Sequence, residues 1–188
     1  MPSLRDKANL AKAIELAQTK YPRLKPVMQD SNIEYGTAAS PGIHSETYPA
    51  DESWNPHPGK WTTQIYDRNQ SPENLSEAIA GEELHRLGSN RKDSLIDNKY
   101  RAMKQASIYA MSPKQMHFNK KMYMKDVHDS GDKRSFNEWM QSSRSDAYIR
   151  GRMFPQQNPE WQKPGVYSPL QAKIIDAMKT HLMTPEEK

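Results

Sequence analysis

The chain contains no cysteine among its 188 residues. This absence excludes disulfide bonds and thiolate metal sites, and it fits assembly in a reducing compartment. Long apolar runs are also missing. Nothing approaches the roughly 18 consecutive apolar residues that a membrane-spanning helix needs, and residues 1–18 are too polar for a signal peptide. We therefore expect a soluble protein that is made in the cytoplasm and has no membrane partner.

Hydrophobic residues are scarce as well, at 35% of the chain, and the mean hydropathy is −1.02. Prolines are frequent, with 14 in the sequence. A chain of this length most often forms one domain. We expect a single domain over residues 1–188, with a modest core and long surface segments.

The net charge of +4 is unevenly distributed. Residues 36–85 hold eight acids and two bases, whereas residues 86–134 hold twelve bases and five acids. A solvated helix surface is the simplest explanation for the basic region. An asymmetry of this kind can also attract an anionic partner. Nucleic acid, bound through residues 86–134, is therefore a possible partner.

The pattern of apolar residues and capping signals predicts a predominantly helical α+β fold. One helix is expected at residues 4–20, where Ser3 is the N-cap. Ser71-Pro72 begins another, at 72–87, and Gly88 ends it. The C-terminal part, residues 92–183, is expected to be helical. Its segments are 92–110, a helix starting at Ser112-Pro113, 136–150, and a helix starting at Ser168-Pro169.

A small sheet should accompany these helices. The segment WTTQIYD at 61–67 alternates as a strand does and is expected at an edge of the sheet. Residues 25–36 offer short strand-like pieces, best at 33–35. Residues 36–60 contain four prolines and three glycines without periodicity, which predicts a long Pro-rich loop. The helix at 72–87 should pack across the sheet.

The segment AIAGEELHRLG at 78–88 places Glu82 and His85 three residues apart on the predicted helix. Helical spacing puts both on the side that also carries Leu75 and Ile79, with Glu83 towards the flank. A buried carboxylate and imidazole need a mutual hydrogen bond, a metal ion or water. Alternatively, the pair sits at the wet margin of an ordinary amphipathic helix.

The stretch SRSDAYIRGRMFP at 143–155 offers further polar partners. Asp146 and Arg150 are four residues apart, so an ion pair on one helical face is the modest explanation. A sharper hypothesis is that Asp146 or Arg150 reaches the Glu82/His85 pair and completes a buried polar network.

The segment WTTQIYDRNQSPENLSEAIAGEELHRLG resembles the edge strand and active-site helix of zincin-type metallopeptidases. Two later segments, SRSDAYIRGRMFP and VYSPLQAKIIDAM, resemble proteins of that type among the virion genes of tailed bacteriophages. The resemblance implies that Glu82 matches the general base and His85 a zinc ligand. Gly81 stands at the first ligand position and offers no side chain. A substitute would come from His117, His128 or Asp146.

This resemblance favours a non-enzymatic structural or assembly protein of a phage virion, built on a degenerate metallopeptidase-like fold and without a cofactor. Its partners would be portal, tail or capsid subunits, or further copies of itself, with Trp54, Trp61 and Trp161 as anchors. The alternatives are an active metal-dependent peptidase or hydrolase with a non-standard zinc ligand set, and a nucleic-acid-binding accessory protein.

Overall fold

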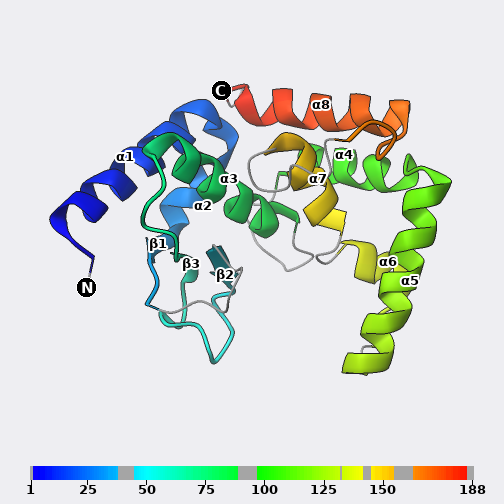
Figure 1. Ribbon diagram of the computed structural model, residues 1–188, viewed down its shortest axis with the longest axis horizontal. Coiled ribbons are helices and arrows are strands. Elements are labelled where there is room, and N and C mark those ends of the chain that lie inside the picture. The colour runs from blue at the N-terminus through cyan, green and yellow to red at the C-terminus, as the bar shows by residue number, and fades with distance from the viewer. Residues whose placement is uncertain are drawn as a thin grey trace. The chain divides into compact units, whose positions relative to one another are not determined.

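The computed structural model describes residues 2–37, 45–88, 97–131, 133–141, 145–154 and 163–185. It confirms a predominantly helical α+β fold with one small sheet (Figure 1). The elements are α1 (Leu4–Lys20), η1 (Pro22–Leu24), α2 (Lys25–Asp30), β1 (Ser31–Tyr35), β2 (Ser45–Tyr48), β3 (Trp61–Ile65), α3 (Pro72–Gly88), α4 (Asn98–Tyr109), α5 (Pro113–Ser130), α6 (Phe136–Trp139), α7 (Ser145–Met153) and α8 (Pro169–Met183).

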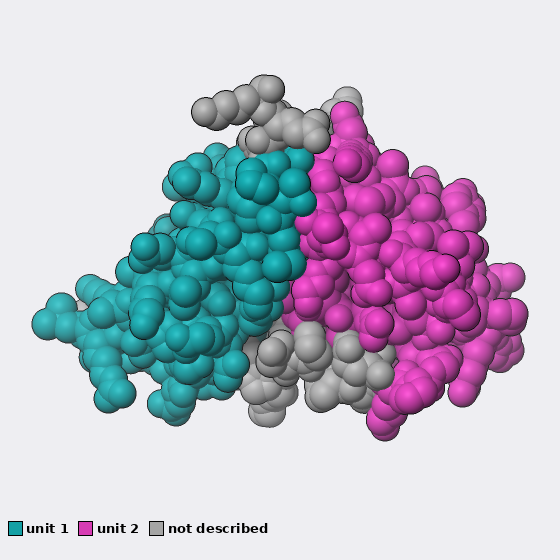
Figure 2. All heavy atoms as spheres, turned by 90° about the horizontal axis from the view of Figure 1, so that it is seen from above, with its two compact units in different colours: residues 1–86, 182–188 teal, residues 87–181 magenta. Residues whose placement is uncertain are grey.

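The chain forms two compact units (Figure 2). Unit 1 comprises residues 1–86 and 182–188, and unit 2 comprises residues 87–181. Unit 1 contains the whole sheet and most of α3, whereas unit 2 is helical in its described part. The expectation of a single domain stays a prediction.

The sheet of unit 1 has the strand order β1-β3-β2. β1 pairs with β3 in parallel, and β2 pairs with β3 antiparallel. The prediction of an edge strand at 61–67 is therefore wrong in one respect, since β3 lies in the centre. The predicted loop at 36–60 contains β2, which the sequence did not indicate because Ser45–Tyr48 has no aliphatic residue.

The strand register divides the side chains of the sheet into two sets. Odd-numbered residues pair with odd-numbered residues across all three strands, and even with even. Because side chains alternate along a strand, one set faces α3 and the other lies on the outer side. Thr47 and Thr63 belong to the helix-facing set, whereas Glu46 and Gln64 belong to the outer set.

The first helix of unit 1 is confirmed at both predicted ends. A capping box starts α1, in which the backbone N–H of Asp6 donates to Ser3 Oγ over 3.1 Å and the Asp6 carboxylate accepts from the Ser3 N–H over 2.7 Å. Ala13 and Ala17 are fully buried on its inner side. The segment after it differs from the prediction, because residues 25–30 form the short helix α2 before β1 begins.

Unit 2 has its own aromatic and methionine core. Trp139 and Met140 are buried with Ile108 and Met111, and partly buried methionines and aromatic residues pack against them. Capping boxes start both α5, at Ser112, and α6, at Ser135. Of the expected helix at 136–150, the structure describes α6 and α7, and residues 142–144 lie outside the described residues, as do residues 92–96 of the expected helix at 92–110.

Gly36 follows β1 at a point where the outer side of the sheet admits no side chain. A Cβ atom at this position would lie 2.2 Å from Tyr66 Cε1. We expect Gly36→Ala to destabilise the chain by about 1–3 kcal/mol, the usual cost of an overpacked site. Urea unfolding measures this change. Thr37→Ala, at an exposed neighbour, is the control. Equal stability of the two variants would contradict the expectation.

Candidate functional site

The helix α3 carries the candidate site, and it is buried almost all round. From Leu75 to Leu87 every residue is buried except His85, which is intermediate. Four of the buried residues are of charged types, namely Glu77, Glu82, Glu83 and Arg86. Such residues are almost never fully buried unless they are paired. The structure provides a partner for each.

The start of α3 follows the sequence prediction. The backbone N–H of Asn74 donates to Ser71 Oγ over 3.3 Å, and Pro72 is the first helical residue. Glu73 lies in the first turn, where the positive end of the helix dipole favours an acid. This cap marks the residue at which α3 begins.

Glu82 is held by the edge strand β2. Its Oε1 accepts from Ser45 Oγ over 2.8 Å, and its Oε2 accepts from Thr47 Oγ1 over 3.1 Å. His85 Nε2 lies 3.9 Å from the same Oε2. The structure therefore brings together the two residues of the predicted pair, with two hydroxyls from the strand that the sequence did not reveal.

Glu83 is the residue that sequence reasoning missed. It was expected on the flank of the helix, but its exposed fraction is 0%. Its Oε2 accepts from Ser31 Oγ over 2.7 Å and its Oε1 from Thr63 Oγ1 over 2.9 Å. The prediction was wrong because it assumed an amphipathic helix with one wet side. A helix buried on all sides has no such flank.

Burial raises the pKa of the Glu83 carboxyl to about 7. The hydrogen bonds from Ser31 and Thr63 and the positive charge of Arg86 oppose this rise, whereas the neighbouring Glu82 adds to it. Removing a carboxylate from water favours its neutral form. Glu83 therefore changes its charge near neutral pH while enclosed in the protein.

Arg86 ties the end of the helix to α2 and the sheet. Its Nη1 donates to the carbonyl of Val27 and to Ser31 Oγ, each over 3.1 Å, and its Nη2 donates to the Asp30 carboxylate. The guanidinium carbon lies 5.2 Å from the centre of the Trp61 ring. Trp61, one of the expected interface anchors, thus packs against Arg86 within unit 1.

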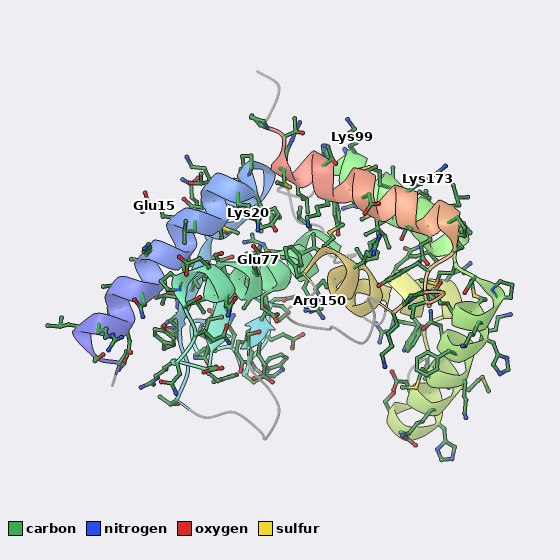
Figure 3. All side chains as sticks on the ribbon, turned by 45° about the horizontal axis from the view of Figure 1, so that its top comes forward. Glu15, Lys20, Glu77, Lys99, Arg150 and Lys173 are labelled. Atoms are coloured by element: carbon green, nitrogen blue, oxygen red, sulfur yellow. The ribbon has the colours of Figure 1, made fainter. Side chains whose placement is uncertain are left out.

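Glu77 forms the corresponding link at the start of the helix. It accepts from Lys20 Nζ and, over 2.9 Å, from the Tyr21 hydroxyl. Figure 3 shows Lys20 at the end of α1 pointing towards Glu77 on α3. Burial, together with the charge of Glu77, raises the pKa of Tyr21, so this phenol keeps its proton. The pair fixes α1 against α3.

The other predicted site residues lie on elements other than α3 or outside the described residues. Arg150 lies on α7 in unit 2, and the side chain of Asp146 is outside the described residues. Their link to the Glu82/His85 pair stays a prediction. Trp54 is 59% exposed, Trp161 lies outside the described residues, and His117 and His128 are exposed on α5.

The described residues contain no group of three or more His, Asp or Glu side chains arranged to hold a metal ion. Glu82 and His85 are the two candidate ligands that lie near each other. Comparisons with protein-family models, curated proteins and solved structures give no match. In the part of the chain that the structure describes, no helix has the length and apolarity to cross a membrane.

The buried Glu83 predicts a pH dependence of folding. An unfolded Glu83 loses its proton near pH 4.5, but the folded one keeps it until about pH 7. Its contribution to stability is therefore complete below pH 4.5 and is lost as the pH rises to 7. A glutamine at this position does not ionise, so Glu83→Gln should not lose stability in this way. We expect the free energy of unfolding of Glu83→Gln, relative to that of the wild type, to rise by about 3 kcal/mol between pH 4.5 and 8.

Chemical denaturation at a series of pH values measures this difference. Glu15→Gln, an exposed change on α1, is the matched control and should follow the wild type throughout. A stability difference between Glu83→Gln and the wild type that does not vary with pH would contradict the expectation.

Proposed function

We propose that this chain is a non-enzymatic assembly protein of a tailed-phage virion, in which a metallopeptidase-like strand-turn-helix serves as scaffold. The observation that carries the proposal is the position of Glu82. The residue that matches the general base is 7% exposed and accepts hydrogen bonds from two hydroxyls of β2. It connects a helix to a strand.

A general base must reach the proton that it removes, either directly or through one water. Both oxygens of Glu82 are instead directed at Ser45 and Thr47 of the same unit. Glu83, on the next position, is bonded in the same manner to Ser31 and Thr63. The two carboxylates together fasten α3 to all three strands, which is a structural role.

The ligand count supports the same conclusion. A catalytic zinc ion usually has three protein ligands and an open position. On α3 the chain offers Glu82 and His85, and Gly81 stands where the zincin resemblance places the first ligand. The virion setting is supported by the resemblance of the sequence segments to phage proteins, and the scaffold role by the hydrogen bonds of α3.

An active hydrolase is the second candidate, and one observation favours it. His85 is the residue of α3 between Leu75 and Leu87 that is not buried, and its side chain is 26% exposed beside Glu82. A metal bound there would reach solvent. Its further ligands would come from other residues of the chain.

Metal analysis separates the two candidates. We expect the full chain, loaded with zinc and freed of excess, to retain much less than one equivalent, and His85→Ala to retain the same amount. His128→Ala, which removes an exposed histidine of α5, is the control. One equivalent of zinc that is lost only in His85→Ala, together with peptide hydrolysis lost in Glu82→Gln, would establish the hydrolase instead.

The virion assignment has its own test. We expect mass spectrometry to detect the chain at a fixed copy number in particles from an infection that expresses it. Deleting the gene should reduce the yield of complete particles. Normal particles that lack the chain would contradict this role.

A further inference from the structure

The outer side of the sheet carries two carboxylates with an amide between them. Glu34 of β1, Gln64 of β3 and Glu46 of β2 lie directly opposite one another in the register. Glu46 Oε2 accepts from the hydroxyls of Tyr48 and Tyr66, each over 2.6 Å. These bonds hold the Glu46 carboxylate in place on the surface of the sheet.

Glu34 is fixed in the same way. It accepts from Gln64 Nε2 over 2.9 Å and from Asn32 Nδ2 over 3.2 Å, and it lies 3.0 Å from His57 Nε2. Burial acts to raise its pKa, but the hydrogen bonds from Gln64, His57 and Asn32 outweigh burial and hold the pKa of Glu34 below its usual value. Glu34 is therefore charged at neutral pH.

The turn after β2 adds two acidic residues and an aromatic ring next to the sheet. It carries Asp51 and Glu52, and Trp54 packs edge-on against Tyr48 with ring centres 5.2 Å apart. Within residues 31–37 and 45–66 the structure describes four carboxylates, and Lys60 is the one lysine or arginine there. We call the surface formed by Glu34, Glu46, Asp51, Glu52 and Trp54 the acidic patch.

A surface of opposite charge lies on α5 in unit 2. Its exposed residues recur at intervals of three and four along the helix, which places them in one stripe. We call them the basic stripe. They are Lys114, His117, Phe118, Lys121, Met124, Lys125 and His128. Phe118 is 49% and Met124 is 64% exposed. Met122 and Tyr123, by contrast, pack against the core of unit 2.

The dimensions of the two surfaces agree. Glu34 and Glu46 lie on the two edge strands, two strand spacings or about 10 Å apart. Lys114 and Lys121 are separated by seven residues, or about 10 Å along the helix axis. Methionine and lysine side chains both make favourable contacts with aromatic rings. Met124 and the lysines therefore suit the exposed Trp54 as well as the carboxylates.

We propose that the basic stripe of one copy of this chain binds the acidic patch of a second copy, which links the chains head to tail. Since the two surfaces differ, a contact between two copies leaves the patch of one copy and the stripe of the other for further copies. Contacts of this kind form rings or open filaments. The inference rests on the proposed assembly function and names a second copy of the chain as one partner.

Nucleic acid suits the basic stripe less well. The stripe contains lysines but no arginine, although bidentate arginine is the usual choice for phosphate. It also exposes Phe118 and Met124 between the charges. A second copy, by contrast, offers carboxylates to the lysines and the exposed Trp54 ring to Met124.

A charge exchange tests the proposal by sedimentation velocity on the full chain at increasing concentration. We expect the wild type to associate, and more weakly as sodium chloride is raised. The stripe variant Lys121→Glu/Lys125→Glu and the patch variant Glu34→Lys/Asp51→Lys should each bind themselves at least tenfold more weakly. An equimolar mixture of the two should regain association, because each variant then meets an opposite charge.

The matched control is Lys99→Glu/Lys173→Glu, which removes two exposed lysines of α4 and α8 (Figure 3) and should associate as the wild type does. Trp54→Ala leaves the hydrogen bonds of the patch intact and should also weaken association. If the patch variant fails to fold, as judged by circular dichroism, Trp54→Ala mixed with the wild type replaces it.

A wild type that stays monomeric at every salt concentration would overturn the proposal, as would a mixture without association. The stripe would be assigned to nucleic acid instead if the wild type is monomeric and binds a single-stranded oligonucleotide, and the stripe variant does not bind it. These outcomes are distinct from failure of the proposed function. A monomeric chain without zinc remains an assembly protein for other partners, and a zinc-binding hydrolase can still self-associate.

Discussion

The position of α3 depends on the cost of burying charge. Glu77, Glu82, Glu83 and Arg86 lie within ten residues of one another on α3, where every residue from Leu75 to Leu87 except His85 is buried. A buried carboxylate without a partner costs several kcal/mol, so each one must meet a donor. The donors come from α1, from the residue after it and from all three strands. Moving or rotating the helix would break several of these bonds together, which fixes its orientation on the sheet.

The sequence predicted those parts of the fold that have a local signal. Ser3, Ser71-Pro72, Ser112-Pro113 and Ser168-Pro169 begin helices in the structure as expected, because a cap depends on neighbouring residues only. β2 was missed since its inward residues are hydroxyls, which have no apolar period. Glu83 was placed wrongly for a related reason, because its partners are the hydroxyls of Ser31 and Thr63 on β1 and β3. The role of these two hydroxyls cannot be recognised locally, because the carboxylate that they bind is 52 or 20 residues away along the chain.

The candidate site was predicted in part. Glu82 and His85 lie near each other because three residues separate them on one helix, which sequence spacing shows directly. Their surroundings follow from strand pairing, and pairing is set by contacts across the sheet. Trp61 illustrates the difference. Its size suggested a surface anchor, but the register of β1 and β3 and the path of Arg86 place the guanidinium beside its ring. The sequence contained one signal that α3 buries several carboxylates. Four glutamates lie between residues 73 and 83 on a helix otherwise rich in small and apolar residues.

The strand order has a consequence for how the sheet forms. β1 and β2 come first in the chain, yet neither pairs with the other, and both pair with β3. A ribosome that has made residues 1–60 has therefore produced two strands without a neighbour. The hydroxyls of Ser31, Ser45 and Thr47 still lack the carboxylates that they bind in the folded chain. Residues 61–83 then supply, within one short stretch, the strand β3 that pairs with β1 and β2 and the carboxylates of Glu82 and Glu83. The sheet should thus appear late and all at once during synthesis, and any fragment that ends before Trp61 should leave its two strands unpaired.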